Sequence, residues 1–224
     1  MYDFIKDPSL YNLVRGPLVW IAFIVFIGGT IYQLRTMILL AKKEKVVYPY
    51  MDLKLSLRSL LHWVIPFNSV NWRKRPVVTT VTFLFHIGLV FTPILLLSHN
   101  ILWRESWGIT WWTLPEGIAD IMTLIVIICC GFFFLRRILA PEVRFVTFDS
   151  DYLILFIAFA PFITGFLAYH QMLLPHKTMV ILHIIFGEIM LAAIPFTRLG
   201  HMFYFFLTRA FMGSDQGYRY SQDW

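Results

Sequence analysis

The chain has 224 residues, of which 58% are hydrophobic and 14% charged, and its mean hydropathy is +0.69. This composition is too apolar for a soluble domain and predicts an integral membrane protein. The net charge of +6 does not indicate nucleic-acid binding, because the cations lie between the apolar runs. The two cysteines, Cys129 and Cys130, are adjacent and supply neither a disulfide framework, a CxxCH haem attachment site nor an iron–sulfur cluster.

The first sixteen residues are polar and aromatic, without the basic start and small-residue cleavage site of a removable signal peptide. The first apolar run, about 17–41, should therefore remain as a membrane anchor. A basic connector follows. Within it the apolar residues Leu53, Leu57, Leu60, Leu61 and Val64 recur at helical spacing, which predicts an amphipathic helix over about 52–65 that lies in the membrane interface.

Four further apolar runs follow, over about 76–103, 117–139, 151–172 and 178–210. Each is long enough to cross a bilayer. The sequence therefore predicts an all-α membrane protein with five transmembrane helices in a single domain, 1–224.

The loops predict the orientation of these spans. Basic residues gather in the connector after the first span, in the connector after the third span and in the tail: Lys42, Lys43, Lys45, Lys54, Arg58, Arg73, Lys74, Arg75, Arg136, Arg137, Arg144, Arg209 and Arg219. The opposite side has only Lys6, Arg15, Arg104 and Lys177. The positive-inside rule places the N-terminus outside and the C-terminus in the cytoplasm.

The last span carries two histidines, His183 and His201, eighteen residues apart. On one continuous helix this spacing is about five turns, so both imidazoles would leave the same face, roughly 27 Å apart along the axis. That rise is close to the hydrocarbon thickness of about 30 Å. The spacing predicts one metal ligand near each surface, as two stacked haems would require.

The second span supplies partners at matching depths, because it runs in the opposite direction. His86 would pair with His201 near the inside, and His99 with His183 near the outside. Two neutral imidazoles can hold the iron of a b-type haem between facing helices. A lone intramembrane histidine more often serves packing or hydrogen bonding, but the matched depths favour ligation for these residues.

The outer ligand has competitors. His99 lies about 220° around the helix from His86, which would turn it away from the same partner unless Pro93 kinks or unwinds the helix. His170 and His176 lie at the same outer level. Gly88 and Gly187, each within about one turn of a histidine, would leave space for a flat macrocycle.

The motifs LFHIG at 84–88 and PFTRLGH at 195–201, together with His183, resemble the gamma (cytochrome b) subunit of respiratory nitrate reductase. They are also similar to the homologous membrane subunits of sulfate-reducer redox complexes, of the high-molecular-weight cytochrome c and dissimilatory sulfite reductase types. The resemblance covers five spans, the topology and three ligand positions. It implies that His86 and His201 bind the inner haem and His183 the outer one. The position of the family's remaining ligand is Leu96 here, so the outer haem's second ligand stays open.

The resemblance also implies partners and a location. Members of this family exchange electrons with a quinone near the outer haem and with an iron–sulfur subunit on the inner side. Menaquinone is the candidate quinone here. The sulfate-reducer relatives imply a periplasmic multihaem cytochrome c and other membrane subunits as partners. The expected location is the bacterial cytoplasmic (inner) membrane.

Several polar residues are candidates for a supporting role. Glu188 lies inside an apolar run, where an unpaired carboxylate is costly, and could carry protons for quinone chemistry or link two helices. Asp120, His170 and His176 could serve the same outer site. Arg198, one turn before His201, could pair with a haem propionate or extend to the lipid interface.

These observations favour an electron-transfer subunit that carries two haems b, passing electrons between a quinone or an outer cytochrome and a cytoplasmic partner. Two alternatives remain. One is a self-contained quinol or ferric reductase that acts at its outer face. The other is a non-redox membrane anchor or transporter whose histidines are structural.

Overall fold

The computed structural model describes residues 8–44, 47–49 and 51–220, and within these residues the chain is helical without a strand. Five helical stretches are long and apolar enough to cross a membrane: Leu10–Lys43, Pro76–Leu95, Glu116–Leu139, Asp149–Tyr169 and His176–Phe196. The prediction of an all-helical, multi-pass membrane protein is confirmed at this level.

The helices form two compact units. Unit 1 comprises the chain up to Val19 and the segment Val81–Met190, and unit 2 comprises Trp20–Thr80 and the chain from Leu191 onward. Unit 1 contains α2 (Pro8–Leu13), the π-helix η1 (Val14–Leu18), most of α6 (Pro76–Leu95), α7 (Leu97–Trp107), α8 (Glu116–Leu139), α9 (Pro141–Arg144), α10 (Asp149–Tyr169) and most of α11 (His176–Ala193). Unit 2 contains nearly all of α3 (Val19–Lys43), α4 (Leu53–Val64), α5 (Val70–Lys74), the short 3-10 helices η2 (Ile194–Phe196) and η3 (Arg198–Gly200), and α12 (His201–Tyr218).

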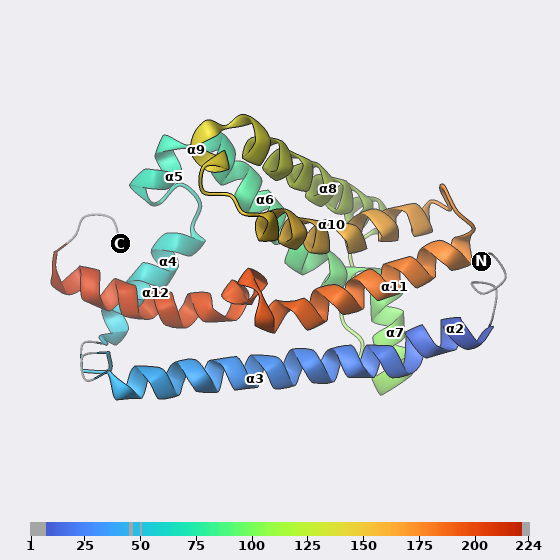
Figure 1. Cartoon of the computed structure of the whole chain (residues 1–224), viewed down its shortest axis with the longest axis horizontal. Coiled ribbons are helices and arrows are strands. Elements are labelled where there is room, and N and C mark those ends of the chain that lie inside the picture. The colour runs from blue at the N-terminus through green and yellow to red at the C-terminus, as the bar shows by residue number, and fades with distance from the viewer. Residues whose placement is uncertain (1–7, 45–46, 50, 221–224) are drawn as a thin grey trace. The chain divides into compact units, whose positions relative to one another are not determined.

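The core of unit 1 lies where α6, α8 and α10 meet, and α8 runs beside α10 (Figure 1). Its buried members are Phe85, Val126, Cys129, Cys130, Ala158 and Phe162. The Cys pair is thus buried as small apolar side chains, which is common for free cysteine. Gly88 of α6 faces Val126 so closely that any added Cβ would overlap the valine side chain. Gly88 therefore serves helix packing, and the prediction that it leaves space for a macrocycle is wrong.

The second span is interrupted, so the prediction of one apolar helix over 76–103 is wrong. Helix α6 ends at Leu95, Leu96 adopts an extended conformation, and α7 begins at Leu97. The last carbonyls of a helix need new hydrogen-bond donors. Here the Nδ1 atom of His99 donates to the Pro93 carbonyl (2.8 Å), the indole N–H of Trp111 to Ile94 (2.8 Å), and the backbone N–H of Leu114 to Leu95 (2.9 Å).

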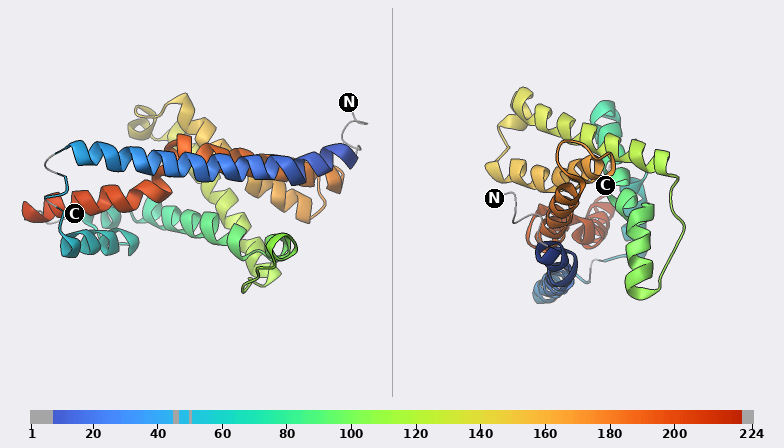
Figure 2. Two further views of the ribbon diagram at one scale, coloured as in Figure 1. Left: turned by 90° about the horizontal axis from the view of Figure 1, so that it is seen from below. Right: turned by 90° about the vertical axis from the view of Figure 1, so that its right-hand side faces the viewer.

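In unit 2, α4 packs against α12 (Figure 2). Small residues allow this close approach: an added Cβ on Gly213 would overlap the side chain of Ser59, which is fully buried. The Ser56 hydroxyl donates to the Ala210 carbonyl (3.0 Å), and the Asp52 backbone N–H donates to the Ser214 hydroxyl (3.0 Å). The amphipathic helix predicted over 52–65 is therefore present, and its small polar residues attach it to α12.

The last predicted span, 178–210, is also interrupted. After α11 ends at Ala193, the chain forms η2 and η3, separated by the extended residue Thr197, before α12 begins at His201. Pro195 causes this interruption because proline lacks an amide hydrogen and clashes with the preceding turn. The Thr197 hydroxyl then accepts a hydrogen bond from the Leu199 N–H (3.2 Å) and starts a new turn. The prediction that His183 and His201 share one continuous helix face is wrong.

Candidate functional site

The structure brings His99 and His183 together within unit 1. Their imidazole centroids are 5.9 Å apart, and the two ring planes differ by only 17°. His99 comes from the first turn of α7 and His183 from α11, so elements far apart in sequence supply the pair. The interruption at Leu96 turns α7 onto a new axis, which removes the 220° mismatch that a continuous helix would impose on His99.

Hydrogen bonds define the protonation of both rings. Nδ1 of His99 lies 2.8 Å from the Pro93 carbonyl oxygen, and Nδ1 of His183 lies 2.8 Å from the Pro161 carbonyl oxygen. A carbonyl oxygen only accepts, so Nδ1 carries the hydrogen in each ring. In the neutral imidazole, Nε2 then keeps its lone pair. Metal-ligating histidines are typically oriented by such a bond from their other nitrogen.

The spacing of the pair suits a metal ion held by both rings. A metal–imidazole bond is about 2 Å long, and the ligating nitrogen lies about 1 Å from its ring centre. Two imidazoles on opposite sides of one metal would therefore have centroids about 6 Å apart. The centroids of His99 and His183 are 5.9 Å apart, and their ring planes are nearly parallel.

Helix α10 shapes the His183 position through two residues that sequence reasoning missed. A Cβ at Gly165 would lie 2.9 Å from Cε1 and 3.0 Å from Nδ1 of His183. A larger residue at this position would therefore displace the His183 ring. Pro161, one turn earlier, supplies the carbonyl that accepts the Nδ1 hydrogen. The pattern PFITG at 161–165 combines a helix-interior proline with a glycine, which was the available signal.

The other predicted pair is divided between the units: His86 belongs to unit 1 and His201 to unit 2. Each shows the same local arrangement, with Nδ1 of His86 2.7 Å from the Thr82 carbonyl oxygen and Nδ1 of His201 2.7 Å from the Arg198 carbonyl oxygen. Arg198 therefore orients His201 through its backbone. Both imidazoles are exposed, and their pairing stays a prediction.

His170 and His176, the two histidines predicted to compete with His99, have other partners. Nε2 of His170 lies 3.0 Å from Oδ1 of Asp120, within hydrogen-bond distance, and Nδ1 of His176 lies 3.0 Å from the Ala168 carbonyl oxygen. Beside them, the Tyr169 hydroxyl donates to Glu116 (3.0 Å). The ends of α8 and α10 thus place a polar group in unit 1, half-exposed at Asp120 and His170.

Glu188 lies on α11, five residues after His183. Its Oε1 atom is buried, and no hydrogen-bond donor reaches it among the described residues. Five residues correspond to a net rotation of about 140° around a helix, so the side chains of Glu188 and His183 leave α11 on different faces. Gly187 has no atom within 4 Å of a built Cβ, which leaves open space one turn from His183.

These features define a multi-pass helical membrane protein with a bis-histidine pair in one of its units. No protein-family model matches the chain, and no solved structure matches it. A protein of Nitratidesulfovibrio vulgaris, strain Hildenborough, is 38% identical over 211 residues, which cover 92% of this chain and 93% of that protein. The chain belongs to the same family as that protein, whose general name, "Protein", assigns no activity.

Proposed function

We propose that the chain is a cytochrome b subunit that carries two haems, in the membrane part of a respiratory redox complex. The observation that carries this proposal is the His99–His183 pair, with 5.9 Å between nearly parallel rings and both Nδ1 hydrogens bound to backbone carbonyls. A haem iron held there would take up and release one electron at a time. The protein's part is to hold both rings in the correct tautomer and orientation.

The small number of protein ligands favours haem over a simple metal ion. Among the described residues, no group of three or more His, Cys, Asp or Glu side chains gathers to hold a metal ion. Structural and catalytic zinc sites use three or four protein ligands. In haem, by contrast, the macrocycle itself surrounds the metal, so two axial imidazoles are enough.

The second haem would use His86 and His201, whose Nδ1 atoms are also bound to backbone carbonyls. By the charge pattern of the loops, this haem would lie toward the cytoplasm and the His99–His183 haem toward the outside. The proposed partners are a cytoplasmic iron–sulfur subunit and a periplasmic multihaem cytochrome c, in the cytoplasmic membrane of a bacterium. The resemblance of LFHIG and PFTRLGH to nitrate reductase gamma subunits supports these assignments.

The direct test is a pyridine haemochrome assay on the purified full chain. We expect two haems b per chain. His99→Ala or His183→Ala should remove one, His86→Ala or His201→Ala the other, and His170→Ala should keep both. A folded wild-type protein without haem would overturn the proposal. Full haem in His99→Ala, with loss in His170→Ala or His176→Ala, would instead move the outer ligand to the loop after α10.

A quinone site beside the outer haem is the second part of the proposal. Quinone chemistry needs groups that exchange protons. Unit 1 offers the Asp120–His170 contact and the buried Oε1 of Glu188, which no donor of the described residues reaches. His176, whose Nδ1 lies 3.0 Å from the Ala168 carbonyl oxygen, is a further candidate.

Glu188→Gln tests the proton role, because glutamine keeps the shape of the side chain and cannot carry a proton. We expect slower haem reduction by a menaquinol analogue in stopped-flow measurements, with both haems still bound. Reduction by dithionite, which needs no quinone site, should be unchanged. If Glu188→Gln is reduced by the menaquinol analogue at the wild-type rate, Glu188 carries no proton in this reaction and its role is structural.

A further inference from the structure

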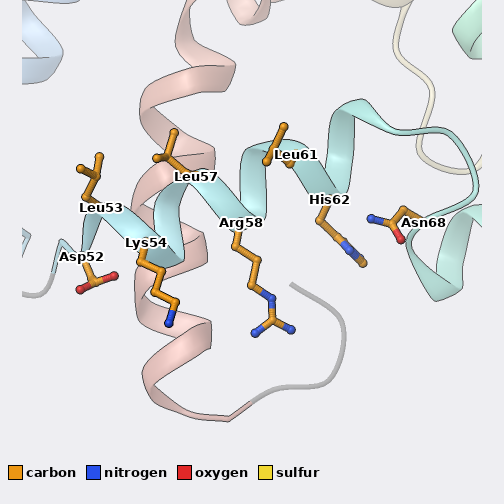
Figure 3. A pocket seen from close by; sticks show the side chains of 8 residues that line it. All are labelled: Asp52, Leu53, Lys54, Leu57, Arg58, Leu61, His62 and Asn68. Atoms are coloured by element: carbon orange, nitrogen blue, oxygen red, sulfur yellow. The ribbon is translucent and has the colours of Figure 1, made fainter.

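A shallow groove runs along α4 in unit 2 and continues to the turn that follows it (Figure 3). The residues that line it are Asp52, Leu53, Lys54, Leu57, Arg58, Leu61, His62 and Asn68. None of them belongs to the haem-ligand positions. The groove therefore invites a separate explanation.

Two parallel ridges border the groove. Leu53, Leu57 and Leu61 recur every four residues and project to one side of the helix, and Lys54, Arg58 and His62 recur at the same interval and project to the other (Figure 3). Residues four apart lie on one helix face. The leucines are 75%, 50% and 61% exposed, so the apolar ridge is not used for packing within the chain.

The attachment of α4 to α12 holds these ridges outward. The face of α4 that carries Ser56 and Ser59 is buried against α12, through the Ser56–Ala210 hydrogen bond and the close contact of Ser59 with Gly213. At the end of the helix the Arg209 guanidinium lies 4.2 Å from the centre of the Trp63 ring. The helix therefore cannot turn to bury its leucines without losing these contacts.

Chain connectivity keeps α4 at the membrane surface. Only residues 44–52 separate it from the end of α3, a helix long and apolar enough to span. An exposed apolar ridge beside positive charge, at this depth, meets acyl chains and phosphates at once. Among the described residues that line the groove, Lys54 and Arg58 are permanently charged cations and Asp52 is the one carboxylate, whose Oδ1 accepts a hydrogen bond from the Leu55 N–H (2.8 Å).

We propose that this groove binds one anionic phospholipid. The phosphate lies against Lys54 and Arg58, and the acyl chains lie along Leu53, Leu57 and Leu61. A soluble phosphate could contact the two cations but would leave the leucine ridge uncovered. The combination of both ridges therefore favours a lipid over a free anion.

The experiment is native mass spectrometry of the purified full chain in detergent, titrated with short-chain phosphatidylglycerol or phosphatidylcholine. The wild type should bind one phosphatidylglycerol in preference to phosphatidylcholine. In Lys54→Gln/Arg58→Gln that binding should weaken about thirtyfold, since each basic residue near an anionic lipid contributes roughly fivefold. Lys42→Gln/Lys43→Gln removes the same charge from exposed positions at the end of α3 and should bind as the wild type does.

Two further variants identify the ligand. The charge-preserving Lys54→Arg/Arg58→Lys should retain binding, and Leu57→Asn should weaken binding of both lipids. Competition with glycerol phosphate should not displace the lipid. Equal loss in the α4 and α3 charge variants would overturn the proposal, as would displacement by glycerol phosphate. The measurement needs no haem, so its outcome is independent of the proposed electron-transfer function.

Discussion

At the scale of single residues, the backbone hydrogen bonds of the histidines carry the strongest functional information. His86, His99, His183 and His201 each direct Nδ1 to a backbone carbonyl. Because a carbonyl accepts only, this arrangement commits the hydrogen to Nδ1 and leaves the lone pair of Nε2 available in the neutral ring. Two of these carbonyls, at Pro93 and Pro161, belong to prolines inside helices, where the regular hydrogen-bond pattern is already disturbed.

Gly165→Ala tests whether α10 orients His183. The added methyl group would lie 2.9 Å from the imidazole, so the ring must move and lose its bond to Pro161. We expect a loss of about 1–3 kcal/mol of stability and, if the proposed haems are bound, an altered spectrum of the His99–His183 haem only. Thermal unfolding and reduced-minus-oxidised spectra would measure the two effects.

Gly131→Ala on α8 is the matched control, because no atom lies within 4 Å of its built Cβ. Alanine in a helix interior is favoured over glycine by about 1 kcal/mol, so this variant should be neutral or stabilised with an unchanged spectrum. Equal behaviour of the two variants would show that Gly165 does not position the ring.

At the scale of elements, interruptions of two apolar runs decide where the histidines lie. Helix α6 ends at Leu95 because its last carbonyls find donors in α7 and the following loop, and α11 gives way to two short 3-10 helices at Pro195. Gly108, at φ +69°, closes α7 in the left-handed conformation that glycine adopts freely. These interruptions place His99 on a separate helix from His86, and His201 on a separate helix from His183.

Trp111→Phe tests the interruption after α6. The indole N–H donates to the Ile94 carbonyl at 2.8 Å, and phenylalanine leaves that carbonyl without this donor. We expect destabilisation of about 1–3 kcal/mol, measured by thermal unfolding in detergent, and weaker retention of the haem proposed between His99 and His183. Trp112→Phe, at a neighbouring side chain that is 67% exposed, should change neither. Identical melting of both variants would contradict the role given to Trp111.

At the scale of the whole molecule, the placement of basic residues predicts the orientation. The connector between the first two spans and the C-terminal tail are rich in Lys and Arg, whereas the loop before α8 has few. The distribution of Lys and Arg among short loops determines the orientation in which the spans insert into the membrane. The two native cysteines are buried, so single cysteines placed in the loops can report the topology.

Cysteine substitutions at Lys45, Gly217 and Trp112 provide the measurement. A membrane-impermeant maleimide applied to intact cells should label Trp112→Cys, in the proposed outer loop, and leave Lys45→Cys and Gly217→Cys unmodified until the membrane is opened. Labelling of the last two from outside would reverse the proposed orientation and exchange the sides assigned to the two haems.

The sequence by itself determined the class of the molecule and most of its helices. Apolar runs long enough to cross a bilayer must satisfy their backbone groups internally, so five such runs require helices. The helical spacing of Leu53, Leu57, Leu60, Leu61 and Val64 likewise predicted α4, since periodicity is a local property. The candidate histidines could also be named from sequence, because a polar side chain is conspicuous in an apolar run.

Only the tertiary structure decided which histidine faces His183. The answer depends on the end of α6, which Trp111 and Leu114 stabilise from more than fifteen residues away along the chain. The Gly165 backbone packs against the His183 ring, which brings α10 and α11 into contact. Neither helix sequence shows a periodic pattern that would predict this contact. Pro195 and Thr197 did signal a break before His201, but the long apolar run concealed it. Hydropathy gives the length of an apolar segment, whereas hydrogen bonds between residues distant in sequence determine where its helix ends.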